Sequence, residues 1–401
     1  MVSCARPGRS EFRPKRVPAC LAIEVPTKVT AINEFIVKVA SRCNLDCDYC
    51  YEYHSGDDSW KTMPKFLSMD SANYLAFRIA EHCREHGLKT VFVTFHGGEP
   101  TLAGADRLER FIEIFLGEAR SDFLIIFAIQ TNATLITDEL CELIRHRNIQ
   151  VSVSVDGNQK HNDLHRLDHR GKSSHVRTAA GIAKLKETVG EQLSGLLAVM
   201  DIKTDPLEVF DALAQYGTTS VEFLLPHHNW DKPPPRPGDD EHAYGKWYFE
   251  IFKAWIGGRN SHLDIRFFTH ILSQLVGNGG IYEAMTLAPI TLLTVNTAGG
   301  YEAVDCIKST GSGAHHLGLH VKETSVSSLL THPAIEVRQK GEGQLAPKCQ
   351  TCRFKTSCAG GYYPHRYSVA NSFNNPSVYC SDLYWLLSEI TTHVKALNRH
   401  A

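Results

Sequence analysis

The segment Cys43-Asn44-Leu45-Asp46-Cys47-Asp48-Tyr49-Cys50 follows the apolar run Phe35-Ile36-Val37-Lys38-Val39. Its three thiols are separated by three residues and then by two. Three thiolates on one short loop can hold three irons of a [4Fe–4S] cube, which four thiolates would saturate. The fourth iron then stays open to an external ligand. The stretch therefore predicts a cluster that binds a further molecule as well as carrying an electron.

A zinc site and a disulfide framework both fit these thiols less well. A zinc site has closely spaced ligand pairs and closes with four ligands, whereas this loop offers three thiols and no local fourth. A disulfide framework is typical of short secreted chains, and this sequence has 401 residues and an N-terminus without an apolar signal region. Its twelve cysteines therefore favour metal or redox chemistry in a cytoplasmic protein.

The composition of the chain argues against two kinds of partner, nucleic acids and membranes. Lys and Arg number 42 against 44 Asp and Glu, so the net charge of −2 argues against nucleic-acid binding. No apolar run is long enough to span a membrane. Residues 1–31 are rich in Arg and Pro, and we expect them to form a flexible basic arm.

Residues 32–230 alternate β-rich runs with helical patterns. A helix is predicted after the cap residue Ser68 and ends at Gly87, and Asp205-Pro206 predicts another helix start. Alternation implies an α/β fold with a parallel sheet, and six units predict an open, partial (β/α)6 barrel whose chemistry lies at the carboxyl ends of the strands. The expected strands are 35–39, 91–95, 124–129, 151–155, 196–199 and 221–225.

Ligand-like residues follow four successive strands. After the second comes His96-Gly97-Gly98-Glu99-Pro100, whose glycines allow close approach and whose Glu99 can accept from a charged amine. Gln130-Thr131-Asn132 follows the third strand. The fourth carries Ser154, with Arg166 beyond it, and a hydroxyl with a guanidinium suits a carboxylate. Each motif alone is weak, but four in register at one barrel end predict a binding site.

Together these motifs resemble the cofactor-binding set of the radical S-adenosylmethionine (SAM) enzymes, over residues 32–230. The resemblance implies that Cys43, Cys47 and Cys50 hold the cluster and that SAM chelates its open iron. It implies contacts of Gly97, Gly98 and Glu99 with the SAM amino group, of Ser154 and Arg166 with its carboxylate, of Asn132 near the ribose and of Tyr49 near the adenine.

Residues 231–290 connect two parts of the chain. The Pro-rich run 231–240 is either a plain connector or a loop over the barrel mouth, and a helix is predicted over 241–255. Residues 291–295 and 301–304 flank Asn296-Thr-Ala-Gly-Gly300, which predicts a hairpin.

The cysteines of residues 291–401 form a second set. Cys349-x2-Cys352-x5-Cys358, with Cys380 further on, resembles the SPASM domain, an auxiliary iron–sulfur module of radical SAM enzymes. Full SPASM domains carry two extra clusters, but here Tyr362 stands where a Cys is usual and the Gly-x4-Cys element is missing. The resemblance therefore implies one auxiliary [4Fe–4S] cluster for electron transfer, held by Cys349, Cys352, Cys358 and Cys380.

Some choices stay open for this second set. A structural zinc on the same four thiols is the alternative. Cys306 is expected to be an unligated residue near the site. Residues 360–368 and 373–382 resemble the FxsB-type branch of radical SAM/SPASM peptide maturases, which install three-residue cyclophanes; their aromatic residues also suit a shield around a cluster.

The resemblance implies a specific reaction. A 5′-deoxyadenosyl radical from SAM removes a side-chain Cβ hydrogen from a ribosomally made precursor peptide, and the carbon radical crosslinks to an aromatic ring. An external one-electron reductant of flavodoxin or ferredoxin type is implied, and His365 and Asp305 are candidates for the base. The alternatives are an ether or thioether crosslink, epimerisation, Ser or Cys oxidation on a sulfatase, and a non-enzymatic electron carrier or cluster-assembly protein.

Overall fold

The computed structural model describes residues 30–277 and 282–397, so nearly all of the expected N-terminal arm lies outside the described residues. These residues contain a nine-stranded sheet of order β6-β5-β4-β3-β2-β1-β7-β8-β9. The strands are β1 (Glu34–Ala40), β2 (Thr90–Gly97), β3 (Leu124–Thr131), β4 (Gln150–Ser154), β5 (Leu193–Val199), β6 (Val221–Leu224), β7 (Leu292–Val295), β8 (Gly300–Glu302) and β9 (His316–His320).

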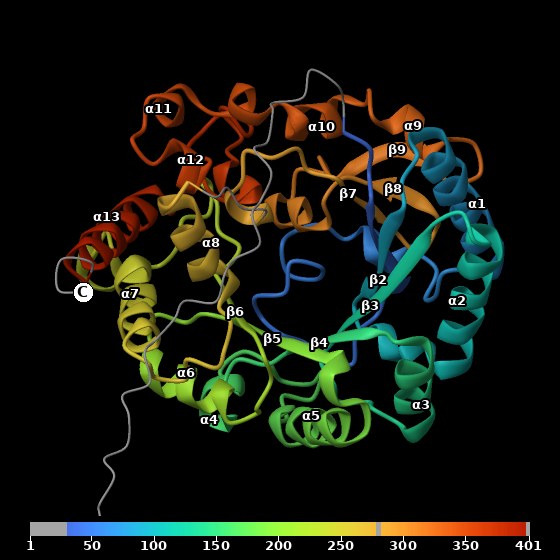
Figure 1. Ribbon diagram of the computed structural model, residues 1–401, viewed down its shortest axis with the longest axis horizontal. Helices are drawn as coiled ribbons and strands as arrows, with labels where there is room; N and C mark the ends of the chain where they lie inside the picture. Colours follow the sequence, from blue (N-terminus) through green and yellow to red (C-terminus); the bar gives the residue numbers. More distant parts are fainter. Residues whose placement is uncertain (1–29, 278–281, 398–401) are drawn as a thin grey trace, which may run out of the picture.

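Helices surround the curved sheet (Figure 1), with α1 to α6 alternating with its first six strands. Helices α7 and α8 follow β6, and short helices precede the long C-terminal α13. They are α1 (Met69–His86), α2 (Ala105–Ala119), α3 (Asp138–Arg147), α4 (Gln159–Asn162), α5 (His175–Val189), α6 (Pro206–Ala214), α7 (Ala243–Ile256), α8 (Arg266–Leu275), α9 (Val326–Leu329), α10 (Pro333–Glu336), α11 (Pro347–Gln350), α12 (Lys355–Cys358) and α13 (Cys380–Leu397).

The six strands β1 to β6 are all parallel to their neighbours, which confirms the predicted partial (β/α)6 barrel. Each strand begins or ends within a few residues of its predicted range, and β5 starts three residues earlier, at Leu193. Apolar side chains such as Phe35, Phe95 and Phe223 are buried between the sheet and its helices. Parallel strands covered on one side by helices bring all six carboxyl ends to the same end of the barrel.

Two predicted helix starts have their expected caps. The Ser68 side chain accepts a hydrogen bond from the Ser71 amide, and Gly87 ends α1 in the left-handed region at φ 67°. The Asp205 side chain accepts from the amides of Leu207 and Glu208 at the start of α6. These bonds satisfy amides that the first helical turn leaves without partners.

The C-terminal region continues the barrel sheet. Strand β7 pairs in parallel with β1, and β8 forms the predicted hairpin with β7, with Val295 opposite Tyr301. The Asn296 side chain accepts from the amides of Ala298 and Gly300 and so shapes the turn. The domain boundary expected between residues 290 and 291 therefore lies between α8 and β7, and β7 belongs to the same sheet as the barrel strands.

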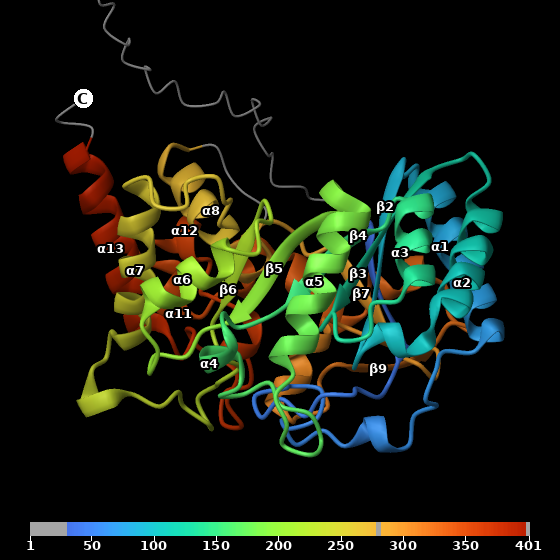
Figure 2. The ribbon, with the colours of Figure 1, turned by 90° about the horizontal axis from the view of Figure 1, so that it is seen from below.

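The Pro-rich run joins the barrel to the C-terminal residues. Directly before the run, the Trp230 amide donates to the Tyr367 carbonyl at 3.0 Å, and within it Arg236 forms an ion pair with Asp382 of α13 at 2.5 Å. Asp382 also accepts from the amides of Tyr244 and Gly245 at the start of α7. Helices α7 and α13 consequently lie side by side, as Figure 2 shows.

Two findings concern membranes and disulfides. Within residues 30–277 and 282–397, no helix combines the length and apolar character that crossing a membrane requires. The ten cysteines in that part of the chain are all free thiols.

Candidate active site

The loop after β1 holds its three thiols in a compact turn. The Cys50 amide donates to the Cys47 carbonyl at 3.0 Å, and the Leu45 amide donates to the Cys43 sulfur at 3.3 Å. Burial raises the pKa of the Cys43 thiol to about 12, and burial also raises the pKa of Cys47. Metal binding deprotonates such thiols, and the placement of three of them on one turn is what suits an iron–sulfur cluster.

Gly97 and Gly98 lie directly against this loop. A Cβ on Gly97, whose φ is 121°, would fall 2.0 Å from the Ala40 carbonyl oxygen. A Cβ on Gly98 would fall 1.9 Å from the Tyr53 hydroxyl and 2.5 Å from the Arg42 backbone. Glycine is therefore required at both positions for contact with residues that flank the Cys43–Cys50 segment, in addition to any approach to a ligand.

Glu99 is buried and connects two strand ends. Its Oε1 accepts from the Thr101 amide, the Thr101 hydroxyl and the Thr131 hydroxyl, and its Oε2 accepts from the Asn132 amide at 2.8 Å. The carboxylate thus fixes the end of β3 relative to the end of β2. The predicted contact of Glu99 with an amine stays a prediction, and Oε2, with one protein donor, is the oxygen that has room for it.

Asn132 lies beside the first cysteine. Its side-chain amide donates to Asn44 at 2.9 Å and points to the Cys43 sulfur at 3.8 Å. On β4, the Ser154 hydroxyl accepts from the Gln130 side chain at 2.8 Å, which leaves its own hydrogen for another acceptor. Both predicted residues therefore face the barrel end that carries the Cys43–Cys50 loop.

Backbone hydrogen bonds place the segment around Arg166 beside the Cys43–Cys50 loop. The Asp46 amide donates to the Leu167 carbonyl at 2.8 Å, so the segment around Arg166 runs along the cysteine loop. Arg166 donates to the Tyr49 hydroxyl at 2.9 Å, and that hydroxyl donates to Asp156 at 2.6 Å. Arg166 is only 6% exposed and its Nε has no hydrogen-bond partner within the described residues. An unpaired buried guanidinium nitrogen fits the predicted carboxylate of SAM.

The four distant thiols line one cavity of about 430 Å³. It is bounded by Cys349, Cys352, Cys358 and Cys380, with Lys348 and Lys355 also lining it. Burial raises the pKa of the Cys358 thiol to about 12, and the neighbouring thiol of Cys380 adds to this rise. The Phe354 amide donates to the Cys352 sulfur at 3.4 Å, the kind of contact that tunes a metal-bound thiolate. Four thiols around one cavity suit either an auxiliary cluster or a zinc ion.

Cys306 belongs to neither of the two sets of thiols. It is buried beside the Tyr362 hydroxyl, and burial raises the pKa of both groups. A cysteine is usual at the position of Tyr362 in the SPASM domains that this region resembles, and here the tyrosine contacts Cys306. That Cys306 is unligated stays a prediction.

The two candidate bases differ in their surroundings. Asp305 accepts from the Tyr51 hydroxyl at 2.8 Å and lies 3.6 Å from Nδ1 of His96. His365 is 2% exposed and neither of its ring nitrogens forms a hydrogen bond within the described residues. Burial, and then the neighbouring His227, hold the pKa of His365 well below its ordinary value. The His365 ring has no hydrogen-bond partner within the described residues, whereas Asp305 contacts Tyr51 beside the first thiol set, so the position of Asp305 is the more favourable one for a base.

Aromatic rings link the two sets of thiols. Tyr51, adjacent to Cys50, has its ring centroid 5.1 Å from that of His227. His227 lies 5.9 Å from Tyr362 and 5.9 Å from His365, which in turn lies 4.9 Å from Tyr379, the neighbour of Cys380. The rings thus form a continuous path from one thiol set to the other.

Sequence reasoning missed several of these residues. His227 follows β6 and Asp201 follows β5, where Asp201 lies 3.1 Å from His165. His227 and Asp201 both follow the carboxyl ends of strands. The rule that functional residues of such barrels lie at these ends, which identified the first four loops, therefore also applies to them. The contact of Tyr51 with Asp305 had no such signal, because 254 residues separate the two.

Comparisons with known proteins agree with this geometry. Residues 37–230 match the family model of the Radical SAM superfamily. A serine-type anaerobic sulfatase-maturating enzyme of Klebsiella aerogenes is 24% identical over 97% of this chain and 91% of its own length. A serine-type anaerobic sulfatase-maturating enzyme of Bacteroides thetaiotaomicron is 33% identical, but the match spans 46% of this chain and only 44% of that protein.

A solved structure shares the fold. Native anSMEcpe with bound AdoMet superposes with a TM-score of 0.77 at 19% identity, over 92% of this chain and all of that one. At that identity the likeness concerns the fold. The cysteine loop, the strand-end residues and the matching family model agree: residues 37–230 form a domain of the radical SAM superfamily, and anaerobic sulfatase-maturating enzymes are among the relatives of the chain.

Proposed function

We propose that this enzyme is a peptide maturase that removes a hydrogen from a side-chain Cβ of a ribosomally made peptide and forms a carbon–carbon crosslink to an aromatic residue. The names of its relatives, which describe maturation of another protein, support a peptide substrate. The FxsB-like residues 360–368 and 373–382 support the crosslink.

The cofactor sites follow from the residues that the barrel end brings together. Cys43, Cys47 and Cys50 would hold the first cluster, and Arg166 with Ser154 would bind the SAM carboxylate. When bound, the cluster and SAM supply the 5′-deoxyadenosyl radical that takes a hydrogen atom from carbon. The Tyr49 hydroxyl is held by Arg166 and Asp156, which fixes this ring of the cysteine loop in place.

The path of rings between the thiol sets is the observation that carries this proposal. A crosslink between Cβ and an aromatic carbon removes two hydrogens: one leaves as an atom, and the other as a proton and an electron. The electron needs an acceptor, and Cys349, Cys352, Cys358 and Cys380 would hold one at the far end of the path from Tyr51. The initial reducing electron would come from an external protein of flavodoxin or ferredoxin type.

The proton needs a base, and Asp305 is placed for that role. Its Oδ2 accepts from Tyr51, one residue beyond Cys50, and the His96 ring lies next to it. His96 stands at the end of β2, directly before Gly97 and Gly98. Asp305 is therefore within reach of the region where the peptide must present its reacting carbon.

Oxidation of a Ser or Cys side chain to an aldehyde is the second candidate. It is favoured by the relatives named sulfatase-maturating enzymes, one of which aligns over 97% of this chain. This reaction also begins with loss of a Cβ hydrogen, releases a proton and passes an electron to an acceptor. The same residues can serve either reaction, so the product decides between them.

Co-expression with the short open reading frames next to the gene, and mass spectrometry of the peptides, tests the proposal. A crosslink lowers the mass by two hydrogens and blocks fragmentation between the joined residues. Oxidation of Ser lowers the mass equally but leaves fragmentation intact and yields an aldehyde that a hydroxylamine probe captures. An aldehyde supports the second candidate and contradicts the crosslink, and an unchanged mass with a D-residue contradicts both.

Two variants control this experiment. Cys47→Ala should abolish the mass change because the first cluster is lost. Cys141→Ala removes a buried thiol of α3 that belongs to neither set, and should leave the product unchanged. When no peptide is modified, release of 5′-deoxyadenosine from SAM by the reduced protein shows that the preparation is active and that the peptide tested is the wrong substrate. Absence of 5′-deoxyadenosine shows that the preparation is inactive.

A further inference from the structure

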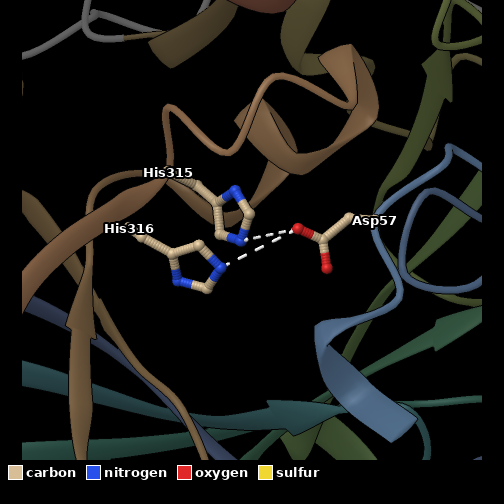
Figure 3. A group of neighbouring side chains, drawn as sticks. All are labelled: Asp57, His315 and His316. Carbon is tan, nitrogen blue, oxygen red and sulfur yellow. Dashed lines mark ion pairs between the residues drawn. The ribbon is translucent and has the colours of Figure 1, made fainter.

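Asp57, His315 and His316 come together where the loop after Cys50 meets the start of β9 (Figure 3). Oδ2 of Asp57 lies 3.4 Å from Nε2 of His315 and 3.8 Å from Nε2 of His316. One ligand atom from each of the three residues lies within 4.8 Å of the other two. No part of the proposed function uses them.

These separations suit a metal ion with nitrogen and oxygen ligands. Ligand atoms about 2.0–2.1 Å from a tetrahedral zinc lie about 3.3 Å from one another. The distances of 3.4 and 3.8 Å are already close to that value. Small side-chain rotations would therefore bring all three atoms into coordination distance.

His315 is the strongest sign of a missing ligand. Its side chain is completely buried, and neither ring nitrogen forms a hydrogen bond within the described residues. Burial of an unpaired polar atom is costly, so native proteins rarely leave one without a partner. As Figure 3 shows, the ring turns toward Asp57, and the contact of Nε2 with Oδ2 of that residue, at 3.4 Å, is longer than a good hydrogen bond. A metal ion bound by both atoms would satisfy Nε2.

The surrounding charges favour a cation. Ion pairs link the ammonium groups of Lys38 and Lys308 to three carboxylates: Lys38 to Glu52 and Glu302, and Lys308 to Glu52 and Asp57. Two positive and three negative groups leave one carboxylate in excess in a poorly hydrated region. Nζ of Lys308 lies 3.8 Å from Oδ1 of Asp57, whereas the histidines face the other oxygen, Oδ2.

A second layer of contacts orients the three side chains. Oδ1 of Asp57 accepts from the Ser59 amide at 2.9 Å and from its hydroxyl at 2.5 Å, which aims Oδ2 at the histidines. Oε1 of Glu302 lies 4.0 Å from Nδ1 of His316. A carboxylate behind the far nitrogen of a histidine is the usual support of a metal-bound imidazole.

We propose that Asp57, His315 and His316 bind a divalent transition-metal ion such as Zn²⁺ or Fe²⁺. His316, whose side chain is 39% exposed, gives the ion a route from solvent and leaves a coordination position open. The ion joins the loop that carries Tyr51 and Glu52 to the start of β9, far away in sequence. This site is independent of the proposed peptide chemistry.

Zinc binding by the reconstituted holoenzyme tests the proposal. A competition titration with a chromophoric chelator, under anaerobic conditions, should show one tight Zn²⁺ per chain beyond the clusters. Asp57→Asn and His316→Gln should each weaken this binding by at least about tenfold. Zinc should raise the thermal unfolding midpoint of the wild type and not that of the variants. Equal zinc binding by the wild type and both variants would overturn the proposal.

Two controls exclude other sources of zinc. His320→Gln changes a histidine of β9 outside the triad and should bind zinc as the wild type does. In the difference spectrum against the same holoenzyme without added metal, Co²⁺ at the site should show visible bands and no gain in sulfur-to-metal charge-transfer absorption, and a gain in that absorption would place the ion on cysteines. Because His316 is partly exposed, its variant is expected to fold, which iron content and circular dichroism verify.

Discussion

The Tyr51 hydroxyl donates a hydrogen bond of 2.8 Å to Oδ2 of Asp305, across 254 residues of sequence. Tyr51 directly follows the third cysteine of the first set, and Asp305 directly precedes Cys306. The bond thus brings a carboxylate from the C-terminal region to the edge of the cysteine loop. A base in this position can act on a substrate without belonging to the barrel.

Replacing Asp305 by Asn should separate radical formation from product formation. We expect the rate of peptide modification to fall by about 10²-fold or more, since proton transfer by a placed base contributes about that much. Release of 5′-deoxyadenosine should continue, because the cofactor sites are unchanged. Both products are quantified by chromatography with mass spectrometry. Tyr74→Phe, at an exposed residue of α1, should match the wild type, and unaltered peptide modification in Asp305→Asn would exclude the base.

Replacing Arg166 by Lys should weaken SAM binding. A lysine keeps the charge but cannot present the fork of donors that reaches Tyr49 and a carboxylate together. We expect the Kd for SAM to rise about tenfold, which corresponds to about 1.4 kcal/mol. Equilibrium dialysis of the holoenzyme measures this change. Arg177→Lys, at an exposed residue that pairs with Asp168, is the matched control, and equal affinity in both variants would rule out the predicted carboxylate contact.

Replacing Cys349, Cys352 and Cys358 together by Ala should halve the iron and sulfide content. The wild type should hold two cubane clusters, and the variant should keep the one on Cys43, Cys47 and Cys50. Iron, sulfide and zinc analyses give the count. Zinc in place of the second cluster would support the structural alternative, and three clusters would show that the contact of Tyr362 with Cys306 does not exclude a further one. Cys83→Ala, in α1, is the control.

Glu222 should make stability depend on pH. It is 2% exposed on β6, and burial raises the pKa of its carboxyl from 4.5 to about 7, against the opposing influence of Arg266. A raised carboxyl pKa favours folding most at low pH, and this contribution is lost as pH rises from about 4.5 through 7. Relative to Glu222→Gln, the wild type should lose roughly 1 kcal/mol between pH 6 and pH 8.

Thermal unfolding midpoints at the two pH values measure that loss. The exposed Glu250→Gln variant, which lies in α7, should follow the wild type. A constant difference between wild type and Glu222→Gln from pH 6 to pH 8 would mean that Glu222 is ionised throughout.

The barrel was predictable because its signals are local. Runs such as 124–129 are apolar and bounded by turns, Ser68 and Gly87 mark helix ends, and alternation of strands and helices fixes a parallel sheet with one handedness. The same rule placed Asn132, Ser154 and Arg166 at one end. Cysteine spacing separated the two thiol sets, because short spacings within a loop reflect the geometry of the metal group that the loop holds.

Contacts between distant segments were not predictable in this way. The residues around Glu99 do not predict that its carboxylate accepts hydrogen bonds from both Thr101 and Thr131. The pairing of β7 with β1 joins strands that lie more than 250 residues apart, and a strand's pattern does not reveal its neighbour. His315 and Asp57 meet for the same reason: their approach depends on the packing of the whole chain.

The parallel pairing of β7 with β1 has a consequence for synthesis of the protein. While the ribosome has not yet released residues 292–295, β1 is an open edge strand that carries the Cys43–Cys50 loop at its end. Contacts this distant in sequence form late in folding. The first thiol set therefore reaches its final surroundings only after most of the chain has been translated.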